Sequence, residues 1–161
     1  PIPGAFPSAI AAGPDGALWF PLNQADAIGR IDTAGTVSVF GLDSPGCAPV
    51  GIAAGPDGAL WFVEIGAGRI GRITPDGAVT HHSLPDAASR PHGVCAGPDG
   101  RVWFTEWAGN ALGSIDAEGR IRRYELPVSG SEPHGIALGP DGALWAALEA
   151  GSLARLAPPQ P

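Results

Sequence analysis

The sequence of 161 residues has no lysine and no methionine, only two cysteines and one tyrosine, and no long apolar run. A membrane span needs about 20 consecutive apolar residues, so no spanning segment is predicted. The formal net charge of −7 argues against contacts with the phosphates of nucleic acids. Two cysteines make a disulfide framework improbable, and we expect free thiols in a reducing compartment. Free thiols fit a cytoplasmic location, which we expect. The sequence has no initiating methionine, so its start is expected upstream and the lack of a secretory signal carries no weight.

What the sequence does contain is a repeat. Each unit carries the string Gly-Pro-Asp-Gly, and successive units are 42 residues apart, beginning at Gly13, Gly55, Gly97 and Gly139. Three residues after each Asp-Gly stands a tryptophan, at Trp19, Trp61, Trp103 and Trp145. A period of about 40–50 residues with one glycine turn and one aromatic per unit is typical of a β-propeller. The sequence therefore predicts an all-β fold in which each repeat forms a blade of four strands.

The third repeat shows how one blade is expected to fold. Short apolar, aromatic or alternating runs predict strands at 91–96, 101–106, 111–115 and 120–126. Tight turns are predicted at 97–100 and 116–119, where Pro, Asp and Gly gather. The Trp and Phe of the second strand should fill the space between neighbouring sheets. No helical period follows the glycine turns, so they are not interpreted as phosphate loops.

The repeat also predicts the domain organisation. We expect one propeller domain over 1–161, with blades at about 7–48, 49–90, 91–132 and 133–161, the last without its outer strand. A propeller must close into a ring, because open sheet edges invite pairing with other chains. Four blades can close a ring, but larger numbers are usual. Further blades, or self-association with a second copy, are therefore expected to complete it.

The repeats differ at one position near the mouth of the expected central channel. After the first Pro of each blade the copies read Ser8, Val50, His92 and His134. Two imidazoles on adjacent blades would thus face a shared space. Two residues before His134 stands Glu132, and residues two apart on an extended chain point the same way. A carboxylate beside an imidazole either binds a metal or orients a base.

The second strands differ as well. Glu64 and Glu106 follow their tryptophans by three residues, whereas Glu149 follows Trp145 by four. A shift of one residue moves a side chain to the other face of a strand unless a bulge intervenes, so Glu149 is a separate candidate. Glu64 and Glu106 are interpreted as structural or rim residues. The adjacent pair at 81–82 must face opposite ways on a strand, and we assign it no site.

Several runs resemble the virginiamycin B lyase family of streptogramin lyases, blade by blade over nearly the whole chain. They are 60–65, 103–107, 131–136 and the Ile-Gly-Arg-Ile third strands. The resemblance implies the last four blades of a seven-bladed propeller, so three N-terminal blades are expected beyond this chain. It also implies an antibiotic-resistance enzyme that linearises type B streptogramins, which are cyclic depsipeptides. The reaction is an Mg²⁺-dependent elimination at the ester linkage.

The resemblance assigns roles to the residues that break the repeat. It implies that His134 is the general base, that Glu132 and Glu149 bind the metal, and that His92 contacts the substrate. Two alternatives stay open. One is a non-catalytic propeller scaffold that binds a peptide or sugar at the channel mouth. The other is a metal-dependent hydrolase of lactones or esters, because a propeller fold alone favours no single function.

Overall fold

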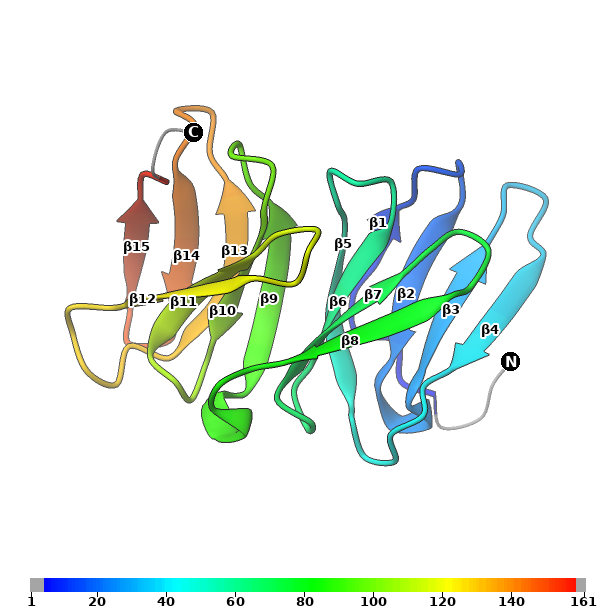
Figure 1. Cartoon of the computed structure of the whole chain (residues 1–161), viewed down its shortest axis with the longest axis horizontal. Coiled ribbons are helices and arrows are strands. Elements are labelled where there is room, and N and C mark those ends of the chain that lie inside the picture. Colours follow the sequence, from blue (N-terminus) through cyan, green and yellow to red (C-terminus); the bar gives the residue numbers. More distant parts are fainter. Residues whose placement is uncertain (1–4, 159–161) are drawn as a thin grey trace.

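The computed structural model describes residues 5–158 and consists of four antiparallel sheets placed side by side (Figure 1). The first three sheets contain four strands each: β1 (Ala11–Ala12), β2 (Leu18–Leu22), β3 (Ala27–Ile31) and β4 (Val37–Gly41); β5 (Pro49–Ala54), β6 (Leu60–Glu64), β7 (Arg69–Ile73) and β8 (Val79–Ser83); β9 (Pro91–Ala96), β10 (Val102–Glu106), β11 (Ala111–Ile115) and β12 (Ile121–Glu125). The fourth contains β13 (Pro133–Leu138), β14 (Leu144–Leu148) and β15 (Ser152–Leu156). Two short 3-10 helices, η1 (Asn23–Ala25) and η2 (Ala87–Ser89), are the helical elements of the described part. The predicted all-β propeller, with a last blade of three strands, is confirmed.

Within each blade the strands follow one another in chain order as an antiparallel meander. The first strands of successive blades, β1, β5, β9 and β13, contact one another in turn. They form the innermost layer, and the fourth strands β4, β8 and β12 lie at the outer edge (Figure 1). The layout therefore brings the starts of β9 and β13 together on the inner side of the sheets.

In residues 5–158 we find no helix of the length and apolar character that a membrane crossing requires.

The repeated glycine turn and tryptophan form one interlocked unit. In the third blade the Trp103 indole Nε1 donates a hydrogen bond of 3.0 Å to Asp99 Oδ1. A Cβ placed on Gly97 would lie 2.3 Å from Trp103 Cδ1, so a side chain there would collide with the indole. The same Trp–Asp bond recurs at 3.0–3.1 Å from Trp19, Trp61 and Trp145. The predicted structural role of the turns and tryptophans is confirmed.

Aromatic stacking extends this unit to the outer strand. Trp19, Trp61 and Trp103 are at most 1% exposed. Each stacks on a ring of its own outermost strand, at centroid distances of 5.5, 5.8 and 4.9 Å, from Phe40, His82 and Tyr124. Trp145 is only partly buried. The tryptophans of the first three blades therefore pack the space between sheets, as the sequence predicts.

One blade rearranges its arginine. In the other three blades an arginine of the third strand pairs with the turn aspartate at 2.6–2.8 Å: Arg30 with Asp15, Arg72 with Asp57, and Arg155 with Asp141. The third blade has Ser114 at that strand position, and Arg101 instead reaches across from the start of β10. Its Nε donates to Ser114 Oγ and its Nη1 to Asp116 Oδ2, both at 3.0 Å. The third blade thus keeps a buried guanidinium, but this group bonds to Ser114 and Asp116 and not to the turn aspartate Asp99.

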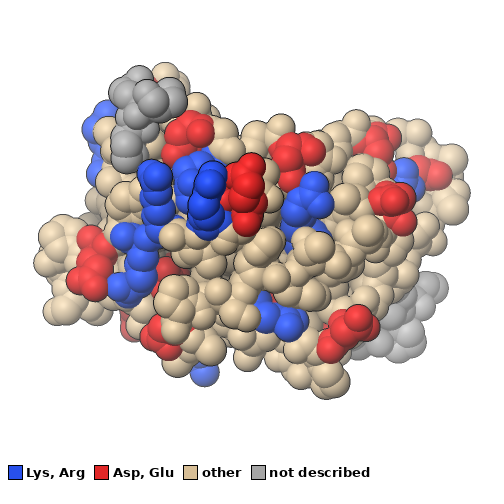
Figure 2. Space-filling view, viewed as in Figure 1, with Lys and Arg blue, Asp and Glu red and all other residues tan. Residues whose placement is uncertain are grey.

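Surface arginines lie beside carboxylates. Arg120 pairs with Asp116 and Glu118, and Arg123 pairs with Glu125, at 2.7–2.9 Å. On the face drawn in Figure 2, groups of basic and acidic side chains are accordingly found next to one another. Much of the arginine charge is therefore balanced within the protein.

Both cysteines are free, as expected. Cys47 is buried and Cys95 is partly buried. Burial raises the pKa of each thiol to about 12, and nearby Glu64 adds to this effect at Cys47. Neither side chain is therefore a thiolate at neutral pH, which makes both poor nucleophiles.

His82 links the stacking to pH. Its ring lies over Trp61 and against the turn at Gly119, where an added Cβ would lie 2.6 Å from His82 Nδ1. Burial lowers the pKa of His82 below its ordinary value, the charges of His81 and Arg72 lower it further, and Asp116 opposes them. Proton uptake by this imidazole is therefore easier in the unfolded chain than in the folded one.

We expect the free energy of unfolding to fall as the pH drops below about 6.5, because the unfolded chain binds the His82 proton first. His82→Phe, which places the residue of the first blade here, should flatten this decline. The slope it removes cannot exceed about 1.4 kcal/mol per pH unit. Urea melts of both proteins between pH 7.5 and 5 measure it. Parallel curves would show that His82 titrates alike in both states.

Candidate active site

An open hollow of about 240 Å³ lies where the innermost segments of the four blades meet. It is lined from β5, β9 and β13 and, in the first blade, from residues just before β1: Ser8, Ala9, Val50, Gly51, Ile52, His92, Gly93, Val94, His134, Gly135 and Ile136. The rings of His92 and His134 lie here with their centroids 3.6 Å apart and their planes at 36°. The structure therefore brings together the two histidines that the repeat comparison singled out.

The two imidazoles lie on strands that approach each other closely. A Cβ added to Gly93 on β9 would lie 2.5 Å from the His134 carbonyl oxygen on β13. Only glycine at this position allows the backbones of neighbouring blades to come so near. The glycine after His92 thus sets the spacing of the histidine pair.

Glu149 lies next to His134. Its Oε1 is 3.7 Å from His134 Nε2, and both side chains are about half exposed, at 46% and 47%. This distance exceeds that of a hydrogen bond but suits an ion pair when the imidazole is protonated. Glu149 follows β14, so the one-residue offset from the Glu64 and Glu106 position does place it in a different setting.

Glu132 lies beside Glu149 through a backbone contact that the sequence did not indicate. The extended chain expected at Glu132 is wrong, because its φ is 51°, in the left-handed region, and β13 begins only at Pro133. Alternation along a strand therefore does not set the direction of its side chain. Its proximity to Glu149 comes instead from a backbone hydrogen bond of 3.1 Å, which Glu149 N donates to the Glu132 carbonyl.

The same backbone arrangement recurs in every blade. Phe6, Ala48 and Arg90 also have φ between 46° and 51°, and their carbonyls accept hydrogen bonds from Asn23, Ile65 and Trp107. The left-handed conformation therefore belongs to the blade, and what changes is the pair of side chains. The fourth blade places two carboxylates there, whereas the third places the Arg90 guanidinium 5.9 Å from the Trp107 ring.

Electrostatics keep His92 neutral. Burial lowers the pKa of His92, the neighbouring His134 lowers it further, and Glu149 opposes them. An uncharged imidazole can donate one hydrogen bond and accept another. His92 is therefore suited to orienting a polar group of a bound molecule.

Glu132 and Glu149 supply two carboxylate donors, and the structure brings their backbones into contact. Both are exposed, and within residues 5–158 neither pairs with an arginine. Over the same residues no cluster of three or more His, Cys, Asp or Glu is placed to hold a metal ion. Mg²⁺ keeps several waters and often takes only one or two protein carboxylates, so this donor set is adequate for it.

Glu64 and Glu106 have different surroundings. Glu64 is fully buried and contacts Arg69 Nη2 at 2.5 Å and His81 Nδ1 at 3.0 Å. Glu106, 1% exposed, lies 3.3 Å from Arg123 Nε. Their carboxylates are already paired inside the blades, which confirms the structural interpretation.

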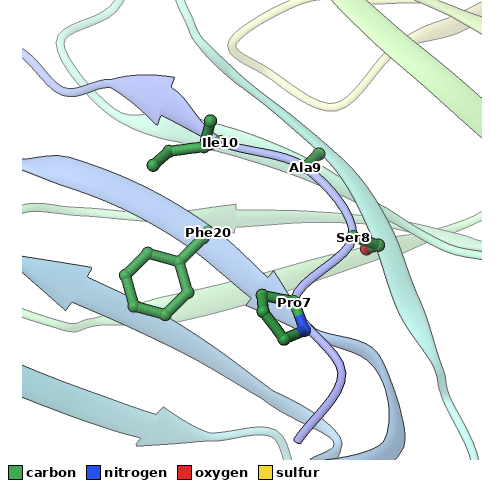
Figure 3. Close-up of a pocket in the computed structure, with 5 residues that line it drawn as sticks. All are labelled: Pro7, Ser8, Ala9, Ile10 and Phe20. Atoms are coloured by element: carbon green, nitrogen blue, oxygen red, sulfur yellow. The ribbon is translucent and has the colours of Figure 1, made fainter.

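A further hollow of about 440 Å³ lies on the first blade and is lined by Pro7, Ser8, Ala9, Ile10 and Phe20 (Figure 3). The stick view shows the rings of Phe20 and Pro7 and the side chain of Ile10 around it. None of these side chains is an acid, a base or a metal ligand. The histidine pair, and not this hollow, is therefore the candidate site.

The model of the virginiamycin B lyase family matches residues 1–156. The chain belongs to the virginiamycin B lyase family. A solved structure of a streptogramin B lyase is 44% identical to this family member, with a TM-score of 0.90, over 96% of this chain and 53% of that one. No curated protein matches.

Two solved structures of virginiamycin B lyase from Staphylococcus aureus are each 42% identical, with a TM-score of 0.93, over 98% of this chain and 54% of theirs. One of them is a catalytically inactive histidine-to-alanine variant with quinupristin. This family member thus spans about half the length of the solved virginiamycin B lyases that it matches.

Proposed function

We propose that this chain carries the reacting groups of a carbon–oxygen lyase that linearises type B streptogramins by elimination at the ester linkage. The observation that carries the proposal is the contact of His134 with both His92 and Glu149 at the central hollow. Support comes from the family and from the relative that binds quinupristin in a form inactivated at a histidine. The substrate class is accordingly a cyclic depsipeptide.

His134 is the proposed general base. Its imidazole accepts the proton from the substrate Cα next to a carbonyl, and the freed electron pair forms a Cα=Cβ double bond. The bond from Cβ to the ester oxygen breaks, and the ester carboxylate leaves. No water is consumed, so the linear product has the mass of the cyclic substrate. Glu149 beside the ring stabilises the imidazolium that forms.

The other residues bind and orient. His92, held neutral, is placed to hydrogen-bond the substrate and fix it against His134. Glu132 and Glu149 are the residues proposed to hold Mg²⁺. When bound, the ion would polarise a substrate carbonyl and so acidify the neighbouring Cα–H.

We expect liquid chromatography–mass spectrometry of a type B streptogramin incubated with this chain and Mg²⁺ to show a shifted peak of unchanged mass. A chelator should abolish the shift. Glu132→Gln should slow the conversion by about 10- to 100-fold or more, because the loss of contacts that support a metal site has an effect of that size. Glu118→Gln, on an exposed turn, is the matched control and should react normally.

A product heavier by one water would replace the lyase by a hydrolase. Binding of the streptogramin with no conversion, even when the blades that complete the propeller are joined to this chain, would favour a scaffold. Equal rates for Glu132→Gln and the parent chain would remove Glu132 from the proposed metal site.

The assembly around this chain is also part of the proposal. Large apolar side chains are exposed on the first and last blades, including Ile10 at 62% and Leu153 at 67%. We propose that further blades, or a second copy of the chain, cover these faces and complete the propeller. A cytoplasmic location and a role in antibiotic resistance belong to the same proposal.

A further inference from the structure

Thr105 joins the two segments that carry the site histidines. It lies on β10, is fully buried, and is one residue from Glu106 and two from Trp107. Its Oγ1 accepts a hydrogen bond of 2.8 Å from Gly93 N and donates one of 2.8 Å to the carbonyl of His134. One hydroxyl thus ties the residue after His92 in the third blade to His134 in the fourth.

Both segments lie where the strand ladder is interrupted. The pairing of β9 with β10 shifts between Phe104 and Glu106, so Thr105 has no opposite partner there. The pairing of β13 with β14 shifts between Pro133 and Ile136, which spans His134. Backbone groups at such bulges are left without their ladder partners and need others. Thr105 supplies a partner on each side.

The blade itself does not require a hydroxyl at this position. The equivalent residues of the other blades are Pro21, Val63 and Ala147. Between the second and third blades, a Cβ on Gly51 would lie 2.5 Å from the His92 carbonyl oxygen, the same approach as at Gly93, with Val63 alongside. Strands therefore pack this closely without a threonine. Among the four blades only the third has a hydroxyl at this position, and it contacts the His134 carbonyl.

We propose that Thr105 is a positioning residue, which holds the backbones at Gly93 and His134 so that the two imidazoles keep their mutual placement. Its effect on rate rests on the proposed function, with His134 as base. A displacement of about 1 Å in a reacting group can cost a hundredfold in rate. Both segments lie at interruptions of the strand ladder, so without the hydroxyl Gly93 N and the His134 carbonyl lose the partner that holds them.

Thr105→Val and Thr105→Ser separate the hydroxyl from the packing. Valine already occupies this place in the second blade, so the Val variant is expected to fold. With a type B streptogramin, it should lower kcat by about 10- to 100-fold with KM changed little. The Ser variant keeps the donor and the acceptor and should stay within about threefold of the parent chain.

Arg101→Ala is the matched control, because it removes buried hydrogen bonds at the opposite end of the same strand. It should lower the thermal melting temperature without changing kcat. A kcat loss in Arg101→Ala as large as in Thr105→Val would mean that lost stability, and not placement, sets the rate, which would overturn the proposal.

Nitrogen-15 NMR of the imidazoles gives a readout that does not depend on turnover. Because the His92 and His134 rings are 3.6 Å apart, each shifts the signals of the other. Thr105→Val should move the signals of both, whereas Thr105→Ser and Arg101→Ala should not. If the parent chain converts no streptogramin, the proposed function fails and these signals alone decide the role of Thr105. Unchanged signals in Thr105→Val would overturn it.

Discussion

Replacing His134 by alanine should lower the rate of streptogramin conversion by about 10²- to 10⁴-fold, the usual contribution of a positioned general base. The folded structure should survive, because the His134 side chain is 47% exposed. Product formation is followed by the unchanged-mass peak, and folding by the thermal melt of the same preparation.

His82→Phe is the histidine control for this experiment. His82 lies on β8, the outermost strand of the second blade, and packs on Trp61, so two strands separate it from the innermost strand β5. The His82→Phe variant should keep full activity. A loss of activity seen only in His134→Ala would then be specific to the site. A His134→Ala protein that retains more than about a tenth of the activity would place the base elsewhere.

Trp103→Ala should cost about 3–5 kcal/mol of unfolding free energy, the range for a large aromatic removed from a packed core. Trp103 is fully buried, stacks on Tyr124 at 4.9 Å and donates its indole N–H to Asp99. The loss therefore combines an empty space between blades with a turn carboxylate that has lost its indole donor. Urea unfolding followed by circular dichroism measures it.

Trp145→Ala provides the internal comparison. Trp145 makes the same bond to its turn aspartate but is only partly buried and has no outer-strand stacking partner among the described residues. We expect it to cost clearly less than Trp103→Ala. Equal losses would show that stacking and burial add little. Should Trp103→Ala fail to fold, Tyr124→Ala measures the same stack more mildly.

The blade could be predicted from the sequence because its determinants are local. The indole of Trp103 finds its partner four residues away at Asp99, so the spacing of the two is visible in every repeat. The strand Pro91–Ala96 was predicted with the bounds that the structure shows. Comparison of the copies likewise singled out His92 and His134, because they replace Ser8 and Val50.

Contacts between blades could not be predicted from the sequence. The left-handed conformation of Glu132 is shared by Phe6, Ala48 and Arg90, which have no chemistry in common that would signal it. The role of Thr105 could not be predicted either, because its partner His134 lies in the next blade. Its departure from Val63 and the other copies was the one available signal.

The recurring left-handed residue, with the amide that bonds to its carbonyl, has a consequence for how such a protein can change. The backbone of each blade offers two side-chain slots at the same end, and the hydrogen bond that shapes them uses no side-chain atom. Phenylalanine, alanine, arginine and glutamate all occupy the first slot without altering it. Substitutions there therefore alter chemistry at little cost in folding, so new activities can be tried in one blade while the others preserve the scaffold.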